Sequence, residues 1–255
     1  MRNSLLTIAC IFIMSGCAST TKKNQQLPAS TQNVAESSDE DIFNEFEEEL
    51  SQKQVTIADP IEPVNKLMFN INDAMYFWVA KPVIHIYTGI VPKPGRIGIN
   101  NFFYNLGTPV RLVNCLLQGK CSAAGKELNR FAINTSVGIL GITDPAKDKW
   151  GLEPAEEDLG QTLAVWGFGD GIYIVWPFLG PSTCRDSVGM VGDAFLNPVR
   201  YVKPTEVSIG ISAVDVVNDG SFHIGDYESF KAASIDPYIA MRDAYIQYRS
   251  QKVKE

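Results

Sequence analysis

Apolar residues recur at steps of three and four along most of the chain, which is the spacing of one face of an α-helix. The first such stripe runs from Val64 to Trp78 and has Asn and Asp residues between its apolar positions. Lys81-Pro82 follows, and because proline lacks a main-chain donor, we expect this helix to kink or end there. The chain stays apolar over residues 83–91, until Pro92-Lys93-Pro94-Gly95 interrupts it.

The same periodicity predicts further helices, whose ends coincide with Gly, Pro, Ser or Thr. Residues 172–179 differ, because they form a continuous run of β-branched and aromatic residues closed by Gly180-Pro181, which is typical of an extended element. Residues 141–157 are expected to form a loop. The chain is therefore predicted to be mainly α, a single helical domain with one short extended or hairpin element. The other predicted helices cover residues 96–106, 109–117, 122–140, 158–166, 182–195, 205–217 and 227–253.

After its N-terminal segment the chain has no run of about 20 unbroken apolar residues, the length that spans a bilayer. Its aromatic residues are nevertheless clustered, and aromatic rings prefer the interface between membrane and water. Amphipathic helices can lie in the plane of that interface. The candidate membrane-interface residues are Trp78, Phe102, Phe103, Trp176 and Phe178.

The N-terminus has the layout of a secretory signal, in which Arg2 precedes an apolar run from Leu5 to Met14 that is too short to span a bilayer. The run ends in Met14-Ser15-Gly16-Cys17, which resembles a bacterial lipobox, with methionine in place of the usual leucine. In that resemblance residues 1–16 are removed and Cys17 becomes the first mature residue, acylated on its sulfur and its amine. The alternative is an ordinary secretory signal followed by a chance cysteine.

Acylation at Cys17 would attach the protein to a membrane, since each buried methylene contributes about 0.8 kcal/mol. The next residue is Ala18 rather than aspartate. By resemblance to lipoprotein sorting, this favours the outer membrane of a Gram-negative envelope, with the chain lipid-anchored on the periplasmic side, at the inner leaflet.

The net charge of −7 is concentrated behind the signal, because residues 17–60 hold nine Asp or Glu residues against three Lys. The rest of the mature chain is close to neutral. The negative net charge argues against nucleic acid as a partner. Residues 17–58 are rich in Ser, Thr, Gln and Asn as well as acids, so we predict a disordered tether. Apolar residues from Ile42 to Leu50 stand at helical spacing, and a short helix that forms on docking is the alternative there.

Three cysteines follow Cys17, and two of them, Cys115 and Cys121, are close in sequence and flank Gly119. The bacterial periplasm is oxidising and permits disulfides. We expect a disulfide between Cys115 and Cys121, and buried free thiols are the alternative.

Residues that carry catalysis or bind metals are scarce. The chain has two histidines, His85 and His223, and its mature cysteines lack the CxxC spacing of zinc sites. It has no Gly-x-Ser-x-Gly sequence, and the glycines at 167, 169 and 171 lack the lysine of a nucleotide-binding loop, so we interpret them as a turn. Asp144 and Asp236 are interpreted as turn or capping residues. We therefore predict no enzyme activity, no catalytic residue, no metal and no cofactor.

Four blocks, in order, resemble the VacJ/MlaA family of lipoproteins. The match covers roughly residues 59–249, which we interpret as the helical domain, and residues 250–255 remain as a tail. The blocks are Asp59-Pro60-Ile61-Glu62-Pro63-Val64-Asn65 with Met68-Phe69-Asn70, Glu157-Asp158-Leu159-Gly160-Gln161-Thr162-Leu163 with Trp166-Gly167 and Gly169, Leu179-Gly180-Pro181-Ser182 with Arg185-Asp186, and Asp236-Pro237-Tyr238 with Arg242-Asp243-Ala244-Tyr245.

The resemblance implies a ring of helices in the inner leaflet of the outer membrane, pierced by an amphipathic channel. In that family, phospholipid leaves the outer leaflet through the channel and passes to a soluble periplasmic lipid carrier, and porin trimers hold the ring. A phospholipid needs an apolar wall for its tails and a polar path for its headgroup, and Asn and Asp beside an apolar stripe provide both. Ordinary core packing is the alternative for these residues. The candidate lipid-path residues are Asn70, Ile71, Asn72, Met75, Gly138 and Gly141.

Two functions compete with phospholipid transport. One is an envelope scaffold or interaction lipoprotein that transports nothing. The other is a lipid-cleaving enzyme, which the scarcity of histidine disfavours.

Overall fold

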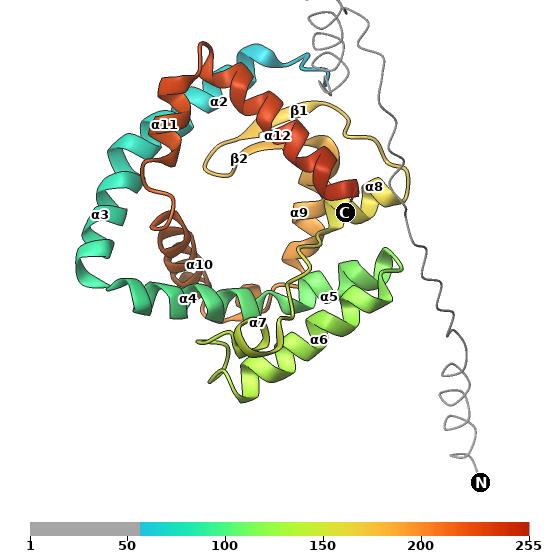
Figure 1. The fold of residues 1–255 in the computed structure, drawn as a ribbon. Helices are drawn as coiled ribbons and strands as arrows, with labels where there is room; N and C mark the ends of the chain where they lie inside the picture. Colours follow the sequence, from blue (N-terminus) through green and yellow to red (C-terminus); the bar gives the residue numbers. More distant parts are fainter. Residues whose placement is uncertain (1–56, 255) are drawn as a thin grey trace, which may run out of the picture. The chain divides into compact units, whose positions relative to one another are not determined.

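The computed structural model describes residues 57–254, so the predicted signal peptide, Cys17 and nearly all of the predicted tether lie outside the described residues. The described helices follow one another around a central opening, and a hairpin extends inward from this ring (Figure 1). The prediction of a mainly α, ring-like domain with a hairpin is confirmed. In chain order the elements are α2 (Glu62–Met75), η1 (Tyr76–Ala80), α3 (Lys81–Ile90), α4 (Lys93–Leu106), α5 (Thr108–Leu117), α6 (Cys121–Ser136), α7 (Pro145–Trp150), α8 (Leu159–Val165), β1 (Tyr173–Trp176), β2 (Gly180–Thr183), α9 (Cys184–Ala194), η2 (Pro198–Tyr201), α10 (Thr205–Gly220), α11 (Asp226–Ala233) and α12 (Pro237–Lys254).

The first arc of the ring is a continuous helical path, α2–η1–α3, with a π-helical turn in the middle. Pro82 cannot donate to the carbonyl one turn earlier, and the turn before it widens so that the N–H of Lys81 bonds to the oxygen of Tyr76, five residues back. The sequence predicted a kink or an end at Lys81-Pro82. The helix does not end there, because the widened turn absorbs the proline.

Two predicted helix boundaries are wrong near α4 and α6. Helix α4 begins at Lys93 rather than at residue 96, since Pro94 occupies a first-turn position where a missing N–H is tolerated. Helix α6 ends at Ser136 rather than at residue 140. Ile139, Leu140 and Gly141 have φ angles of 55°, 59° and 89°, which are incompatible with a right-handed helix.

The loop predicted over residues 141–157 contains the short helix α7. Asp144 caps it by accepting a hydrogen bond from the N–H of Lys147, as its interpretation as a capping residue predicted. Helix α8 begins with a capping box, in which Asp158 and Gln161 bond to each other's main-chain N–H groups.

The predicted extended element is the antiparallel hairpin β1–β2, in which Tyr173 pairs with Thr183 and Trp176 pairs with Gly180. Helix α9 begins at Cys184, with Thr183 as its capping residue, rather than at residue 182 as predicted. The helix predicted over residues 227–253 is divided into α11 and α12, and Asp236 accepts hydrogen bonds from the first N–H groups of α12.

Buried side chains in this domain are mostly polar. Among the described residues, nine hydrophobic residues and seventeen polar or charged residues are buried, whereas 37 large hydrophobic residues are exposed. Soluble proteins bury most of their large apolar residues and rarely expose large apolar patches, so this surface suits an apolar environment. None of the helices within residues 57–254 combines the length and apolar character needed to cross a membrane. A small apolar cluster is formed by Tyr173, Val175, Tyr238 and Ile246.

Candidate functional site

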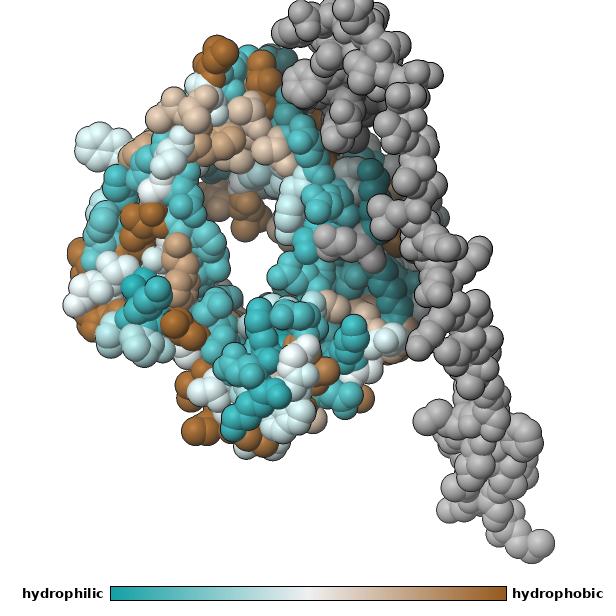
Figure 2. Space-filling model, viewed as in Figure 1, coloured by the Kyte–Doolittle hydropathy of each residue, from teal (hydrophilic) through white to brown (hydrophobic). Residues whose placement is uncertain are grey.

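The central opening persists when every atom is drawn, and its rim carries hydrophilic and hydrophobic side chains in this view (Figure 2). The hairpin β1–β2 extends into the ring from the side of α2 and α12 (Figure 1). An opening with both kinds of surface can accommodate an amphipathic molecule. Its surroundings are therefore the candidate functional site.

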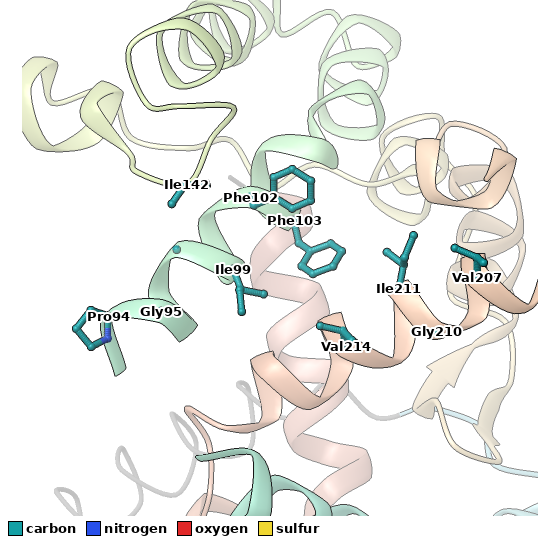
Figure 3. A pocket seen from close by; sticks show the side chains of 11 residues that line it. Pro94, Gly95, Ile99, Phe102, Phe103, Ile142, Val207, Gly210, Ile211 and Val214 are labelled. Carbon is teal, nitrogen blue, oxygen red and sulfur yellow. The ribbon is translucent and has the colours of Figure 1, made fainter. Parts of the chain in front are cut away.

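A cavity of about 980 Å³ forms a groove between α4 and α10. This volume is at the upper end of the range found for small-molecule sites, about 300–1,000 Å³. Side chains from the two helices lie across the groove from one another (Figure 3). The lining residues are all apolar or glycine: Pro94, Gly95, Gly98, Ile99, Phe102, Phe103, Ile142, Val207, Gly210, Ile211 and Val214.

Glycines set the width of this α4–α10 groove. A Cβ atom on Gly98 would lie 3.0 Å from the Ile142 side chain, so glycine there allows the loop after α6 to approach α4. A Cβ atom on Gly210 would meet nothing within 4 Å. Glycine at position 210 therefore leaves space in the groove that a larger side chain would fill.

The hairpin is fixed to α2 by two asparagines seven positions apart, on one face of the helix. Asn65 is buried, donates to the carbonyl oxygen of Tyr173 at 2.9 Å and accepts from the N–H of Val175 at 2.9 Å. Asn72 repeats the pattern at the tip, donating to the oxygen of Trp176 at 2.9 Å and accepting from the N–H of Phe178 at 2.8 Å. Each side-chain amide thus satisfies two main-chain groups that a neighbouring strand would otherwise satisfy.

The other candidate lipid-path residues of α2 have different surroundings. Asn70 and Ile71 are exposed, whereas Met75 is partly buried. The side chain of Asn70 forms no hydrogen bond with another residue among residues 57–254. Of the four α2 candidates, Asn72 therefore has the clearest structural role, which is to position the hairpin.

Gly138 and Gly141 lie in the tight turn after α6. A Cβ atom on Gly138 would lie 2.5 Å from the carbonyl oxygens of Asn134 and Thr143, and one on Gly141 would lie 2.5 Å from the Cβ of Asn105 on α4. Both glycines are buried. They allow close packing of this turn, which also carries the groove residue Ile142.

The candidate interface aromatics fall into three groups. Trp78 is 83% exposed in η1, and Phe178 is 75% exposed at the hairpin tip. Phe102 and Phe103 line the groove (Figure 3). Trp176 is half-exposed, and its indole N–H donates to the hydroxyl of Ser187 on α9 at 2.8 Å.

A charged cluster joins α8, α9 and α12. Arg249 donates from Nη2 to Asp158 and to Asp186 at 2.9 Å each, and Asp186 also accepts from the hydroxyl of Tyr245 at 2.8 Å. Burial disfavours the charge of Asp186, but hydrogen bonds from Arg249 and Tyr245 and the nearby positive charges outweigh it, so its pKa lies below the ordinary value. Asp193 on α9 is the opposite case, because burial is the largest influence there and its pKa is raised.

Helices α8 and α9, which this cluster joins, pack very close to each other. A Cβ atom on Gly189 of α9 would lie only 2.4 Å from the main-chain nitrogen of Gly160 on α8. A cavity of about 500 Å³ borders the cluster and is lined by Arg249 and Asp193, among others.

Arg249 and the groove residues of α10 were not among the predicted site residues. The apolar positions on all sides of α10 are the signal that could have identified its groove residues.

The predicted disulfide is not formed. Cys115 and Cys121 are free thiols, the first buried in α5 and the second exposed at the start of α6. The turn between the helices places one thiol inside the packed interface and the other in solvent. Cys115 therefore corresponds to the alternative of a buried free thiol, and burial raises its pKa to about 11.

Within residues 57–254, no group of three or more His, Cys, Asp or Glu side chains is placed to hold a metal ion. His85 and His223 are both exposed, and the ring of His223 contacts the carbonyl oxygen of Asp219. What the described site offers is an apolar groove, a central opening and a fixed hairpin. This arrangement can bind and guide an amphipathic molecule.

Comparison with known proteins gives a consistent result. A family model described as MlaA lipoprotein matches residues 57–252. A Shigella flexneri protein named intermembrane phospholipid transport system lipoprotein MlaA is 34% identical over 193 residues, covering 74% of this chain and 76% of the relative. An uncharacterized protein of Rickettsia felis is 30% identical over 217 residues, covering 85% of this chain and 86% of the relative.

A solved structure described as "Structural basis for maintenance of bacterial outer membrane lipid asymmetry" has a similar fold. Its TM-score to this chain is 0.68 and its sequence identity is 31%. The similarity covers 77% of this chain and 99% of the other. Fold and sequence therefore agree over the described domain.

Proposed function

Because the chain belongs to the MlaA lipoprotein family, we propose that it removes mislocalised phospholipid from the outer leaflet of the outer membrane. The phospholipid passes through the central opening and is handed to a soluble periplasmic carrier, which maintains the lipid asymmetry of the membrane. Acylated Cys17 anchors the protein to the inner leaflet of the outer membrane, and a porin trimer holds it in place. The names of its relatives support the first part, and the family resemblance motivates the anchor and the partners.

The single observation that carries this proposal is the α4–α10 groove. Its lining has no polar side chain, and its volume of about 980 Å³ is large enough for a flexible apolar ligand. An apolar ligand gains about 25 cal/mol for each Å² of apolar surface removed from water. A lipid tail is such a ligand, and the neighbouring opening gives a polar headgroup a different surface (Figure 2).

The exposed apolar residues support a position in the leaflet. Trp78, Val79, Val83, Ile86 and Ile90 are all exposed on η1 and α3. In water these side chains would form an unfavourable surface, whereas in lipid they are solvated by acyl chains. A helix that lies in the plane of the leaflet uses such a face without crossing the bilayer.

Transport by this chain needs no covalent step. Phospholipid in the outer leaflet moves toward the carrier with a decrease in free energy. The protein lowers the free-energy barrier to this movement, because contacts with the groove and the opening replace the contacts between lipids. Asn65 and Asn72 already satisfy four main-chain groups along β1 and the hairpin tip, so these groups are not left open to a passing lipid.

The test is to delete the gene and measure outer-leaflet aminophospholipid with a membrane-impermeant amine reagent. We expect the label to rise in the deletion strain and to return to its original level when the full chain is restored. A Cys17→Ser variant at matched protein level should fail to restore it, because that variant lacks the anchor. Unchanged labelling in the deletion strain, with loss of another envelope complex, would favour the scaffold function instead.

A further inference from the structure

The α4–α10 groove ends at a polar cluster built around Arg96. Arg96 follows the groove residue Gly95 on α4, and its Nη1 donates to the carbonyl and hydroxyl oxygens of Ser221 at 2.9 Å each. Asn218 lies one helical turn after the groove residue Val214 and donates to the main-chain oxygen of Arg96 at 3.1 Å. The main chain of Arg96 therefore adjoins the end of the groove formed by Gly95 and Val214, and its guanidinium lies beyond that end, at Ser221.

Arg96 lacks the carboxylate partner that most arginines of this domain have. Within residues 57–254, Arg96 and Arg200 are the arginines that form no ion pair. The Nε atom of Arg96 is buried without a hydrogen-bond partner, and its Nη2 donates to none of the described residues. A buried donor without a partner is rare in folded proteins and unfavourable. The Nη2 donors, which are not buried, remain open to an anionic ligand. The arginines with carboxylate partners are Arg111, Arg130, Arg185, Arg242 and Arg249.

The chemistry of the groove and of the guanidinium fits one kind of molecule. The apolar lining suits an acyl chain, and a planar guanidinium binds two oxygens of a phosphate in parallel. Lys93, exposed one turn before Arg96 on α4, also forms no ion pair with a described residue and adds positive charge on that side. A phospholipid joins a phosphate diester to acyl chains in a single ligand.

We propose that Arg96 binds the phosphate of a phospholipid whose acyl chain lies in the α4–α10 groove. This proposal rests on the proposed function and adds a specificity-determining residue to it. Arg96 makes the groove prefer lipids that carry a phosphate over neutral lipids with the same chains. Without Arg96 the groove would bind diacylglycerol and phospholipid alike.

The test uses the purified full-length acylated protein in detergent and native mass spectrometry. The two probes are dioleoylphosphatidylglycerol and dioleoylglycerol, which share acyl chains and differ in the phosphate-linked headgroup. We expect the wild-type protein to prefer the phospholipid by about tenfold or more, since a hydrogen bond to a charged group contributes about 1.5–3 kcal/mol. Equal binding of the two lipids by the wild-type protein overturns the proposal without any variant.

Two variants separate the phosphate contact from the acyl contact. Arg96→Gln should remove most of the preference, bringing the two lipids to within about threefold, by weakening phospholipid binding more than dioleoylglycerol binding, because dioleoylglycerol has no phosphate for Arg96 to contact. Gly210→Phe should weaken both lipids together, since it fills the groove where a side chain meets no protein atom. An unchanged preference in Arg96→Gln, or unchanged binding in Gly210→Phe, contradicts the proposal.

Arg200→Gln is the matched control, because Arg200 has no ion pair among the described residues and stacks on Phe195 away from the groove lining. It should bind both lipids as the wild-type protein does. Arg96 also connects α4 to the end of α10, so Arg96→Lys provides a variant that keeps the charge. It should retain part of the preference for the phospholipid. The preference is a ratio of two lipids bound by one sample, so it reports on the folded protein alone.

The outcomes also separate this proposal from the proposed function. If Arg96→Gln loses the preference and cells lacking the protein show normal outer-leaflet lipid, the lipid site stands and the transport function fails. If the preference is unaffected while the deletion strain accumulates outer-leaflet phospholipid, the transport function stands and the role of Arg96 fails.

Discussion

Asn72 accepts a hydrogen bond of 2.8 Å from the main-chain N–H of Phe178, a residue 106 positions later in the chain. With its donated bond to the oxygen of Trp176, this contact fixes the tip of the hairpin to α2. The exposed Phe178 at the hairpin tip is thereby held at a defined place relative to α2. The position of this apolar residue thus depends on one amide side chain.

Replacing Asn72 with alanine should free the hairpin tip. The N–H of Phe178 loses its acceptor, so its hydrogen exchange should speed up by about fivefold, as expected for the loss of about 1 kcal/mol of local stability. Amide exchange followed by mass spectrometry measures this. Asn70→Ala is the matched control on the same helix, because Asn70 is exposed, and it should leave exchange at the tip unchanged. Equal exchange in the two variants would show that Asn72 does not restrain the hairpin.

Replacing Arg249 with glutamine should destabilise the domain strongly. Asp158 and Asp186 would then face each other without the cation between them, and breaking a buried ion pair on one side costs about 3–5 kcal/mol. Chemical denaturation in detergent measures the free energy of unfolding. Lys147→Gln removes an exposed pair with Glu153 and should change it by less than about 1 kcal/mol. Similar losses in both variants would be inconsistent with a structural role for the cluster.

Acid should destabilise the domain through Asp186. An acid whose folded pKa lies below its unfolded value of about 3.9 adds stability above that pH, and this stability is lost as the pH falls through the folded pKa. We therefore expect the free energy of unfolding to fall below about pH 4, and Asp186→Asn to flatten that fall. Asp193 has a raised pKa, so its removal should have the opposite effect and steepen the fall. Measurement of the free energy of unfolding from neutral to acid pH tests both expected changes.

The turn after α6 should tolerate no side chain at either glycine. Gly138→Ala places a Cβ atom 2.5 Å from two carbonyl oxygens, and Gly141→Ala adds a side chain at a φ of 89°. Each should destabilise the domain by about 1–3 kcal/mol. Gly125→Ala, in the exposed middle of α6, meets nothing within 4 Å and should stabilise it by about 0.5–1 kcal/mol. Thermal unfolding of the three variants measures the contrast.

Thiol labelling should distinguish the cysteines of the mature protein. Cys121 and Cys184 are exposed and should react in the folded state, whereas Cys115 is buried, has a pKa raised to about 11 and should react only on unfolding. The count should be the same with and without reductant. Loss of two reactive thiols in the absence of reductant would instead support the predicted disulfide between Cys115 and Cys121.

Most helices could be predicted from the sequence because their signals are local. The apolar stripe of α2, the capping residue Asp144 and the run of β-branched and aromatic residues around β1 are all decided within a few residues. The end of α6 was missed because positive φ angles at Ile139 and Leu140 are imposed by packing of the turn against α4, which sequence spacing does not reveal.

The candidate site was harder to predict, because its parts meet only in three dimensions. Asn72 was identified as a polar residue beside an apolar stripe, but its bonds to residues 176 and 178 depend on how the hairpin is placed. The groove joins α4 to α10, more than 100 residues later, and apolar periodicity alone cannot pair two helices. Arg249 pairs with acids on two other helices for the same reason.

If this chain clears phospholipid from the outer leaflet, the clearance should be visible in time in living cells. Expression of the full chain would be induced in a deletion strain that has already accumulated outer-leaflet aminophospholipid, which is then labelled at intervals with the impermeant amine reagent. We expect the label to fall steadily to the wild-type level once the protein appears, and to fall more slowly with Gly210→Phe at equal protein level. A label that stays constant while the protein accumulates in the outer membrane would show that the chain does not clear phospholipid from the outer leaflet.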